Sequence, residues 1–472
     1  MIKTSILTTF LAALLAFSPA NAKKKQPAKE LFPNGEAIPA WFNDTARVDI
    51  ATLGRQYVIT EHGVCHNPAI VQTKAIQAVI DKAAAEGGGV IVIPEGTFLS
   101  GSLFFKQGTH LYVKQGGCLK GSDRIADFEM RETRMEGQTL KYFSALVNAD
   151  GVDGFTITGP GTIDGNGYRY WEEFWIRRQF NKQCTNLEAL RPRLVYISNS
   201  KNITVQDVSL INSPFWTNHL YKCERVKYLG CYIYAPTKGL GMVGKNGAPS
   251  SDAIDIDFCH DILISGCYMS VNDDAVVLKG GKGTFADKDP RNGPNYNIIV
   301  QDCNYGKVHA CITFGSESLH DWNIIMRRIK FEGVNRVVWF KMRPDTPQHY
   351  ELSRFEDLSG SADAFVVTLP WTQFFKPEER KDMPLSRVND ITFRNINVEC
   401  KKFFDVKSSD KYSLENFSFE NINAKETGGK ETWHPEYVKG INVKNLVING
   451  AAPKAAKTVN KAGKSDTPEE FL

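Results

Sequence analysis

The chain has 472 residues, and its 57 Lys and Arg against 53 Asp and Glu give a formal net charge of +4. Lysines at 23–25 and in the segment after Ala451 carry much of that excess, so the rest of the chain is close to neutral and nothing in it calls for nucleic acid. Beyond the N-terminus no apolar run is long enough to form a membrane helix, which argues against a membrane span.

The N-terminus has the pattern of a secretory signal peptide. Lys3 is followed by an apolar stretch at 6–17 that is too short to cross a bilayer, and a small-residue cleavage pattern ends at Ala22. We therefore predict a signal peptide over 1–22 and export to the periplasm or the medium. The alternative is an N-terminal anchor that stays uncut. Residues 23–42 are interpreted as a polar lead-in.

One amphipathic helix is predicted near the start of the mature chain. Apolar residues recur at helical spacing over 71–85, among them Ile76, Val79 and Ile80, and the glycines at 87–89 end the pattern. Short β-branched runs with the alternation of strands follow at 90–93, 101–105 and 110–113. The helix would suit the open end of a solenoid as a cap.

The main body repeats a short strand followed by Gly, Asn or Asp and a second apolar run. Spacings of about 23 to 36 residues with loops of unequal length are typical of a parallel β-helix, and Asn and Gly suit its tight left-handed corners. A β-sandwich is the alternative. We predict an all-β, single-stranded, right-handed parallel β-helix over 43–450 and a disordered tail over 451–472. The repeating strands lie at 203–205, 226–229, 262–264, 298–300, 324–326, 391–393, 417–419 and 441–443.

The cysteines follow the same repeat. Cys231, Cys267 and Cys303 are 36 residues apart, as are Cys223 and Cys259, and none forms a CxxC pair. Equal spacing favours a ladder of free, buried thiols on successive coils over disulfides, and makes a zinc site unlikely.

The densest group of acids lies at 252–257 and 273–274. Asp252 precedes Asp273 by 21 residues, close to one coil, so both are expected on the same face, with Asp274 adjoining. Carboxylates so close repel one another, which raises at least one pKa, and glycoside hydrolysis needs one protonated acid and one ionised base. Solvated turn residues and a calcium site are the alternatives. For Asp255 and Asp257 the solvated reading is as good as the functional one.

At this point the sequence resembles the polygalacturonase family, glycoside hydrolase family 28. Ser-Ser-Asp252, Asn-Asp273-Asp274, His309 and Phe-Lys341 are similar, in order, to the family's Asn-Thr-Asp, Gly/Gln-Asp-Asp, Gly-His-Gly and Arg-Ile-Lys. The segments 159–167 and 212–216 resemble two earlier signatures, so the likeness covers nearly the whole mature chain.

The resemblance implies an inverting hydrolase that acts on pectic substrates. Asp273 corresponds to the general acid, and Asp252 and Asp274 to the carboxylates that position and deprotonate water. His309 corresponds to the histidine beside the acid, and Lys341 to a lysine that contacts a galacturonate carboxylate. Further candidates for substrate binding are Asn212 and His219. No cofactor, metal or nucleic-acid partner is expected, and the protein is expected to be a monomer.

Two departures from the family pattern bear on the substrate. His309 lacks flanking glycines, and Trp339 stands where the family has an arginine suited to bidentate carboxylate recognition. Arg336 or Arg343 would have to compensate, while Trp339 either stacks on a sugar or fills the core.

Two other functions compete with hydrolysis. A lyase-like eliminase would need Ca²⁺ and a basic residue as proton abstractor, and a β-helix that only binds glycans has no need of mutually repelling acids. Long insertions at 168–192, 280–295 and 371–387 carry aromatic residues, and loops of this kind shape binding sites. We take them to wall off one end of the groove, which favours release of single sugars from a chain end.

Overall fold

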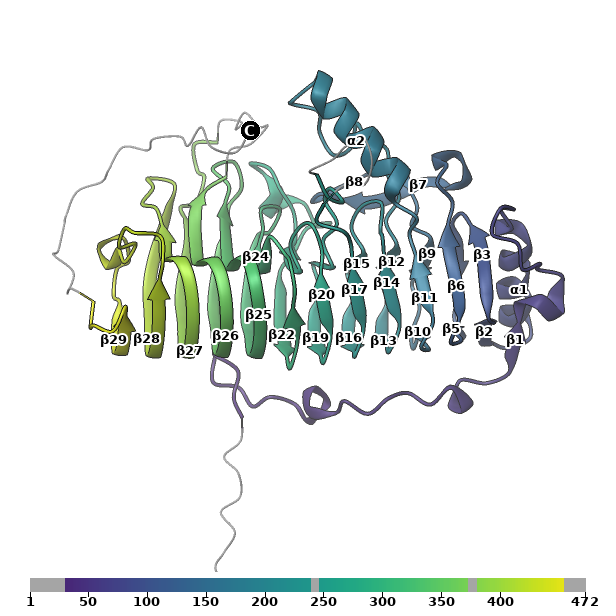
Figure 1. Cartoon of the computed structure of the whole chain (residues 1–472), viewed down its shortest axis with the longest axis horizontal. Helices are drawn as coiled ribbons and strands as arrows, with labels where there is room; N and C mark the ends of the chain where they lie inside the picture. The colour runs from purple at the N-terminus through teal and green to yellow at the C-terminus, as the bar shows by residue number, and fades with distance from the viewer. Residues whose placement is uncertain (1–29, 239–245, 372–379, 454–472) are drawn as a thin grey trace, which may run out of the picture.

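Three stacks of parallel strands wind along one axis in the computed structural model, which describes residues 30–238, 246–371 and 380–453 (Figure 1). In this part of the chain 27 strands join one continuous sheet and a separate hairpin forms a second sheet. The connections are those of a right-handed parallel β-helix, the hand that twisted parallel strands favour. The predicted signal peptide and residues 454–472 of the predicted tail lie outside the described residues.

Each coil contributes one short strand to each stack. The first stack contains β1 Gln56–Val58, β2 Gly89–Ile93, β5 Thr109–Val113, β10 Thr156–Thr158, β13 Lys201–Gln206, β16 Glu224–Leu229, β19 His260–Ser265 and β22 Asn295–Gln301. The second contains β3 Gly96–Ser100, β6 Gly117–Gly121, β11 Thr162–Asp164, β14 Ser209–Ile211, β17 Tyr232–Tyr234, β20 Tyr268–Ser270 and β23 Asn304–Tyr305. The third contains β4 Leu103–Phe105, β9 Val147–Asp150, β12 Val195–Ser198, β15 Asn218–Tyr221, β18 Ile254–Asp257, β21 Val276–Lys279 and β24 Ala310–Phe314.

The later coils are long strands that bend around the corners without a break. They are β25 His320–Met342, β26 His349–Pro370, β27 Ser386–Val406 and β28 Tyr412–Glu426, and β29 Asn442–Ile448 ends the helix. Single 3-10 turns lie at Ala40–Asn43, Ile50–Thr52, Ile59–His62, Ile125–Asp127, Ala286–Lys288 and Pro435–Tyr437.

The register of the first stack confirms the predicted repeat. Ile203 pairs with Val226, Val226 with Ile262, and Ile262 with Ile298, so equivalent apolar residues stack along the interior. Burying these columns removes the apolar strand faces from water, which is the main favourable term in such a fold. The 36-residue spacing is thus one coil of the solenoid.

Left-handed backbone at the corners explains the repeated Asn. Asn395, Asn421 and Asn445 have φ near +55°, from 54° to 58°. The side chain of Asn445 donates to Asn421 at 3.2 Å, and Asn421 donates to Asn395 at 3.2 Å. Asn tolerates this conformation better than other non-glycine residues, and the side-chain ladder satisfies amides that turn outward.

The ten cysteines are free, as the repeat predicted. Cys231, Cys267 and Cys303 are buried on successive coils, and the backbone N–H of Cys223 lies 3.2 Å from Cys259 Sγ. They act as small apolar fillers of the interior.

The predicted capping helix is α1, Thr73–Ala85. It buries Ile76, Val79, Ile80 and Ala83 against the first coil at one end of the solenoid (Figure 1). Without it, the edge strands of that end would be open to further pairing.

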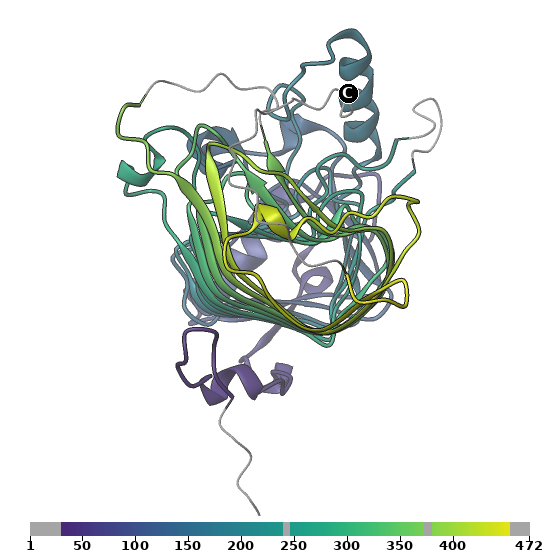
Figure 2. The same ribbon diagram turned by 90° about the vertical axis from the view of Figure 1, so that its left-hand side faces the viewer.

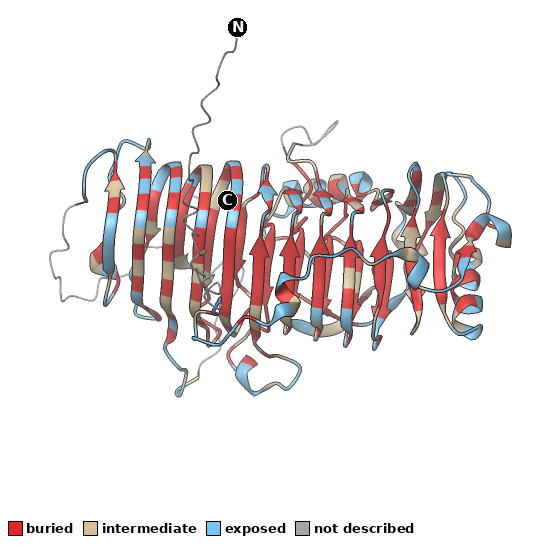
Figure 3. Ribbon diagram, turned by 90° about the horizontal axis from the view of Figure 1, so that it is seen from below, coloured by how far each residue is buried: buried red, intermediate tan, exposed pale blue. Residues whose placement is uncertain are grey.

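The predicted lead-in does more than its polar composition suggested. Residues 30–55 form a strap that runs outside the first stack, from the middle of the molecule back to β1 (Figures 1 and 3). Phe32, Ile38 and Phe42 are buried in it, and they cover the outward side chains Leu229, Leu263, Ile299 and Ile325.

Two elements lie over the third stack. Helix α2 spans Tyr168–Phe180, and the antiparallel hairpin comprises β7 Met130–Met135 and β8 Gln138–Phe143. Both rise from the side of the molecule opposite the strap (Figure 2). No described helix is long and apolar enough to cross a membrane.

Candidate active site

A cavity of about 530 Å³ lies on the third stack, beneath α2 and beside the hairpin. Six of the ten residues predicted to form the site line it, together with further charged and aromatic side chains. The predicted six are Asp252, Asp273, Asp274, His309, Trp339 and Lys341, and the others include Lys279, Lys282, Glu317 and Trp371.

The coil repeat brings the acids together. Asp252 lies just before β18, Asp273 and Asp274 just before β21, and His309 just before β24, so they occupy one corner on three successive coils. The backbone N–H of Asp274 contacts both Asp252 Oδ1, at 3.2 Å, and Asp273 Oδ1, at 3.0 Å. The cluster is therefore held by the turn as well as by its side chains.

Asp273 and His309 form a charged pair at the edge of the cavity. His309 Nδ1 lies 3.4 Å from Asp273 Oδ1. Burial acts to raise the pKa of Asp273, but the contact with His309 and the positive charge of Lys341 outweigh it and lower that pKa to about 2. For His309, burial acts in the opposite direction and the Asp273 carboxylate prevails, so its pKa is raised. The pair thus holds one proton near pH 6, on the imidazole in the free protein.

Asp252 has the opposite environment. Its side chain is buried, and burial together with the neighbouring Asp273 carboxylate raises its pKa well above the usual value. The sequence analysis expected at least one raised pKa among these close carboxylates. The raised pKa belongs to Asp252, however, and not to Asp273, the residue that the family resemblance makes the acid.

Asp274 is held by a lysine. Lys341 Nζ donates to Asp274 Oδ2 at 2.7 Å, and both side chains are largely buried. Lys341 lies near the end of β25, and its side chain reaches Asp274 past the intervening coil, which carries β24. The family resemblance implies that this lysine contacts a galacturonate carboxylate. In this structure, it contacts the Asp274 carboxylate instead.

A second buried charge network lies on the cavity floor, and the sequence analysis missed it. Lys279 Nζ lies 3.1 Å from Glu317 and 3.6 Å from Asp255. Burial acts to lower the pKa of Lys279, but these carboxylates outweigh it and raise it well above the usual value. One sequence signal could have revealed this network. Lys279 directly follows the apolar run 276–278, which places a positive charge at the end of a buried strand.

Asp255 and Asp257 are not solvated turn residues, one of the two readings left open by the sequence. Both are fully buried on β18. Asp257 forms an ion pair with Arg134 at 2.9 Å, with both side chains inaccessible, while Asp255 faces Lys279. Alternation with Ile254 and Ile256 points them outward from the coil, where Arg134 of the hairpin covers Asp257 and Lys279 lies against Asp255.

The hairpin closes one side of the cavity. Glu136 at its tip lies 3.6 Å from Lys282, and a Cβ on Gly137 would lie 2.9 Å from Glu317 Cβ and 3.1 Å from the Lys282 nitrogen. The tip therefore touches the opposite wall. A separate cavity of about 600 Å³, lined by Arg131, Tyr196, Tyr221 and Lys222, begins on the other side, and the two cavities share no lining residue.

Four predicted site residues lie outside the cavity lining. Arg343 is buried in a bidentate contact with Asp345, and His219 is fully buried, accepting at Nδ1 from Arg193 at 2.7 Å. Asn212 donates to Asp164 at a coil corner. The pattern of strands in the sequence could not show that Arg343, His219 and Asn212 already form hydrogen bonds with other polar side chains of the protein.

Arg336 and Trp339 belong together. The Arg336 guanidinium lies 3.9 Å from the centroid of the Trp339 ring, and Lys341 Nζ lies 4.1 Å from the same centroid. Trp339 is 5% exposed and packs on Ala310, Ala364 and Val367. Its main role is thus packing that supports Lys341, with one edge at the cavity.

A cation could also be held here. Ligand atoms of Asp273, Asp274 and His309 lie within 4.8 Å of one another. In this structure, however, His309 and Lys341 already supply positive charge to these carboxylates.

A parallel β-helix with three carboxylates, a histidine and lysines in one groove defines a glycoside hydrolase. Residues 92–335 match the model of the family described as Glycosyl hydrolases family 28, and the chain belongs to that family.

Individual relatives agree with this assignment. A probable polygalacturonase of Vitis vinifera is 27% identical over 220 residues, 45% of this chain and 41% of the relative. An endo-polygalacturonase of Pectobacterium parmentieri is 24% identical over 309 residues, 64% of this chain and 71% of the relative. The crystal structure of a hyperthermoactive exopolygalacturonase from Thermotoga maritima superposes with a TM-score of 0.71 at 20% identity, covering 87% of this chain and 95% of that one.

Proposed function

We propose that this protein is an exo-acting, inverting pectic glycosidase that releases galacturonic acid from the end of a pectic chain. The observation that carries the mode of attack is the hairpin, whose tip touches the wall beside Lys282 and Glu317 and ends the cavity. A polymer entering such a cavity can present only a terminus. The relatives are named after both endo and exo activities, so likeness alone does not decide the mode.

The charge of the cavity suits a uronic acid. Lys279, Lys282 and Lys341 line it, and ammonium groups attract carboxylates through charge and hydrogen bonds. The substrate would compete with the carboxylates that now hold these lysines. Trp371 and the exposed edge of Trp339 give an apolar surface for a sugar face.

The chemistry follows from the proton held by Asp273 and His309. When substrate binds, His309 passes its proton to Asp273, 3.4 Å away. Asp273 then gives that proton to the glycosidic oxygen, and the carbon–oxygen bond breaks with its electron pair on that oxygen. Water attacks the sugar carbon from the opposite face and loses its proton to Asp274, while Asp252 holds the water. Inversion follows because bond formation and bond cleavage take place on opposite faces.

An eliminase is the weaker candidate. It needs an unprotonated base, and the buried Lys279 is held as an ammonium by Glu317. We further propose that the chain is exported after cleavage at Ala22 and is a monomer, which fractionation and sedimentation would test, and that its catalysis requires no metal ion.

Time-resolved product sizing on pectic fractions tests the proposal. Exo-action yields monosaccharide from the first time point with slow loss of viscosity, and excess chelator leaves the rate unchanged. Mixed oligomers at early times would overturn the exo mode. An unsaturated, ultraviolet-absorbing product would overturn hydrolysis.

A further inference from the structure

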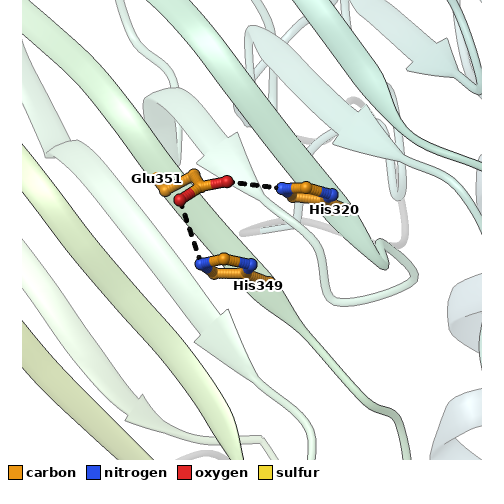
Figure 4. Close-up of side chains that lie close together, drawn as sticks. All are labelled: His320, His349 and Glu351. Carbon is orange, nitrogen blue, oxygen red and sulfur yellow. Dashed lines mark hydrogen bonds and ion pairs between the residues drawn. The ribbon is translucent and has the colours of Figure 1, made fainter. Parts of the chain in front are cut away.

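We propose that His320, His349 and Glu351 form a divalent-metal site of zinc type that joins two coils of the β-helix. The three side chains are partly exposed on two neighbouring strands (Figure 4). They form a group distinct from Asp273, Asp274 and His309, and none of them lines the catalytic cavity. The proposed function makes no use of them.

The register of the long strands creates the site. His320 on β25 pairs with His349 on β26, and Glu351 follows two residues later on the same face of β26. The two imidazoles stack, with ring centroids 4.7 Å apart and an interplanar angle of 7°. Figure 4 shows both rings directing a nitrogen towards the single carboxylate between them.

Both separations between the carboxylate and a histidine nitrogen are close to those of a zinc site, and all three ligand atoms lie within 4.8 Å of one another. Glu351 Oε1 lies 2.8 Å from His320 Nε2, and Glu351 Oε2 lies 3.2 Å from His349 Nε2. Zinc bonds of about 2.0–2.1 Å at tetrahedral angles place ligand atoms roughly 3.3 Å apart. Small rotamer changes would therefore let a metal ion replace the hydrogen-bonded protons.

A neighbouring side chain completes the set. Asn389 on β27 has its Oδ1 2.7 Å from His349 Nε2, and its amide nitrogen donates to Glu351 at 3.2 Å. It can supply a fourth oxygen ligand or orient the carboxylate, and it extends the site to a third coil. Two imidazoles and one carboxylate suit Zn²⁺ better than Ca²⁺ or Mg²⁺, which prefer oxygen ligands.

The expected consequence is stabilisation, because a ligand that binds only the folded chain shifts the unfolding equilibrium. The site ties β25 to β26 in the part of the chain that contributes Lys341 to the catalytic cavity. Zinc would therefore raise the thermal midpoint while turnover at moderate temperature stays the same.

Isothermal titration of chelator-treated, full-length protein with Zn²⁺ tests this inference, followed by thermal unfolding. We expect one ion per chain and a higher midpoint, with at least a tenfold loss of affinity in both His349→Gln and Glu351→Gln. His434→Gln is the matched control, because His434 pairs with Glu436 on the surface at 3.0 Å, outside the cluster. It should bind as the wild type does.

Asp273→Asn distinguishes this site from the catalytic cluster. If zinc bound there, this variant would lose the ion and the His349 variant would keep it, which would overturn the proposal. Absence of binding by the wild type at micromolar Zn²⁺ would overturn it as well. Co²⁺ as a spectroscopic probe should give the intense visible bands of tetrahedral coordination in the wild type.

Discussion

Asp273 is the residue on which the proposed chemistry depends. It is the acid of the cluster that contacts the histidine, and it is more exposed than Asp252 or Asp274, with 27% of its side chain accessible. A leaving oxygen can reach it, whereas Asp274 is covered and held by Lys341. In the proposed chemistry His309 supplies its proton, while Asp252 and Asp274 handle the attacking water on the opposite face of the sugar.

Asp273→Asn should abolish turnover with little change in folding, because an amide has no proton to give to a leaving group. General acid catalysis is worth about 10²–10⁴-fold, so we expect kcat to fall by at least about 100-fold. Substrate binding, measured by calorimetry with a galacturonate oligomer, should remain. A variant that keeps more than roughly a hundredth of the wild-type rate would show that another group is the acid.

The pH profile should report the pair formed by Asp273 and His309. The pKa of Asp273 is lowered to about 2 and that of His309 is raised, so the pair keeps its transferable proton from pH 2 up to a value above the usual one for His. As pH rises through the pKa of His309 the proton is lost, and kcat/KM should fall.

In His309→Gln only carboxyl groups can hold that proton, so the basic limb should move to lower pH. Profiles of kcat/KM for both proteins check this, because they report groups of the free enzyme. An unshifted basic limb would separate His309 from the proton transfer.

At the scale of elements, the hairpin β7–β8 decides which substrates can enter. It rests on the buried Arg134–Asp257 ion pair and on an apolar cluster of Met135, Tyr142, Phe215 and Trp216. Removing one partner of such an ion pair costs several kcal/mol, roughly 3–5. The wall is therefore rigid rather than a mobile flap.

Replacing residues 131–142 with an Asn-Gly turn should open the cavity towards the neighbouring one. Met130 pairs with Phe143, so a two-residue turn can link them. Asp257→Asn is introduced in the same variant to avoid an unpaired buried charge. We expect mixed oligomers at early times from a pectic polymer, measured by product sizing.

The matched control is Asp257→Asn alone, with the hairpin intact. It should still release monosaccharide first. Monosaccharide from the shortened variant would show that other loops close the groove.

At the scale of the molecule, the strap of residues 30–55 acts as a lateral seal. It forms hydrogen bonds along several coils, among them Val48 with Gln206 at 2.9 Å and Lys227 with Asp44 at 3.0 Å. Its apolar side chains cover a column of outward Leu and Ile that would otherwise lie in water. Unfolding of the strap would expose one apolar face of the solenoid.

Phe42→Ala should lower the free energy of unfolding by about 3 kcal/mol, as expected for deleting a buried aromatic ring. The side chain is 1% exposed within the strap cluster. Urea unfolding measures the change, and kcat/KM should stay at the wild-type value. Glu36→Ala, at an exposed strap position, is the control and should leave the midpoint unchanged. Equal midpoints for both variants would mean that the strap adds nothing to stability.

The sequence by itself determined the features that repeat. Columns of Ile and Val, corner Asn residues and equally spaced cysteines predicted the coils, because each coil meets the same packing and backbone demands. The same periodicity placed Asp252, Asp273 and His309 on one corner. That these three side chains lie together was therefore predictable before the structure.

Only the tertiary structure decided what covers the groove and which polar side chains are already engaged. The hairpin tip reaches Lys282 across a separation of almost 150 residues, and Arg343 and His219 are held by Asp345 and Arg193. Such contacts depend on where single insertions fold back onto the solenoid, and no periodic signal in the chain encodes that placement. The path of an insertion is set by side-chain packing and ion pairing, which become defined only when the whole surface is assembled.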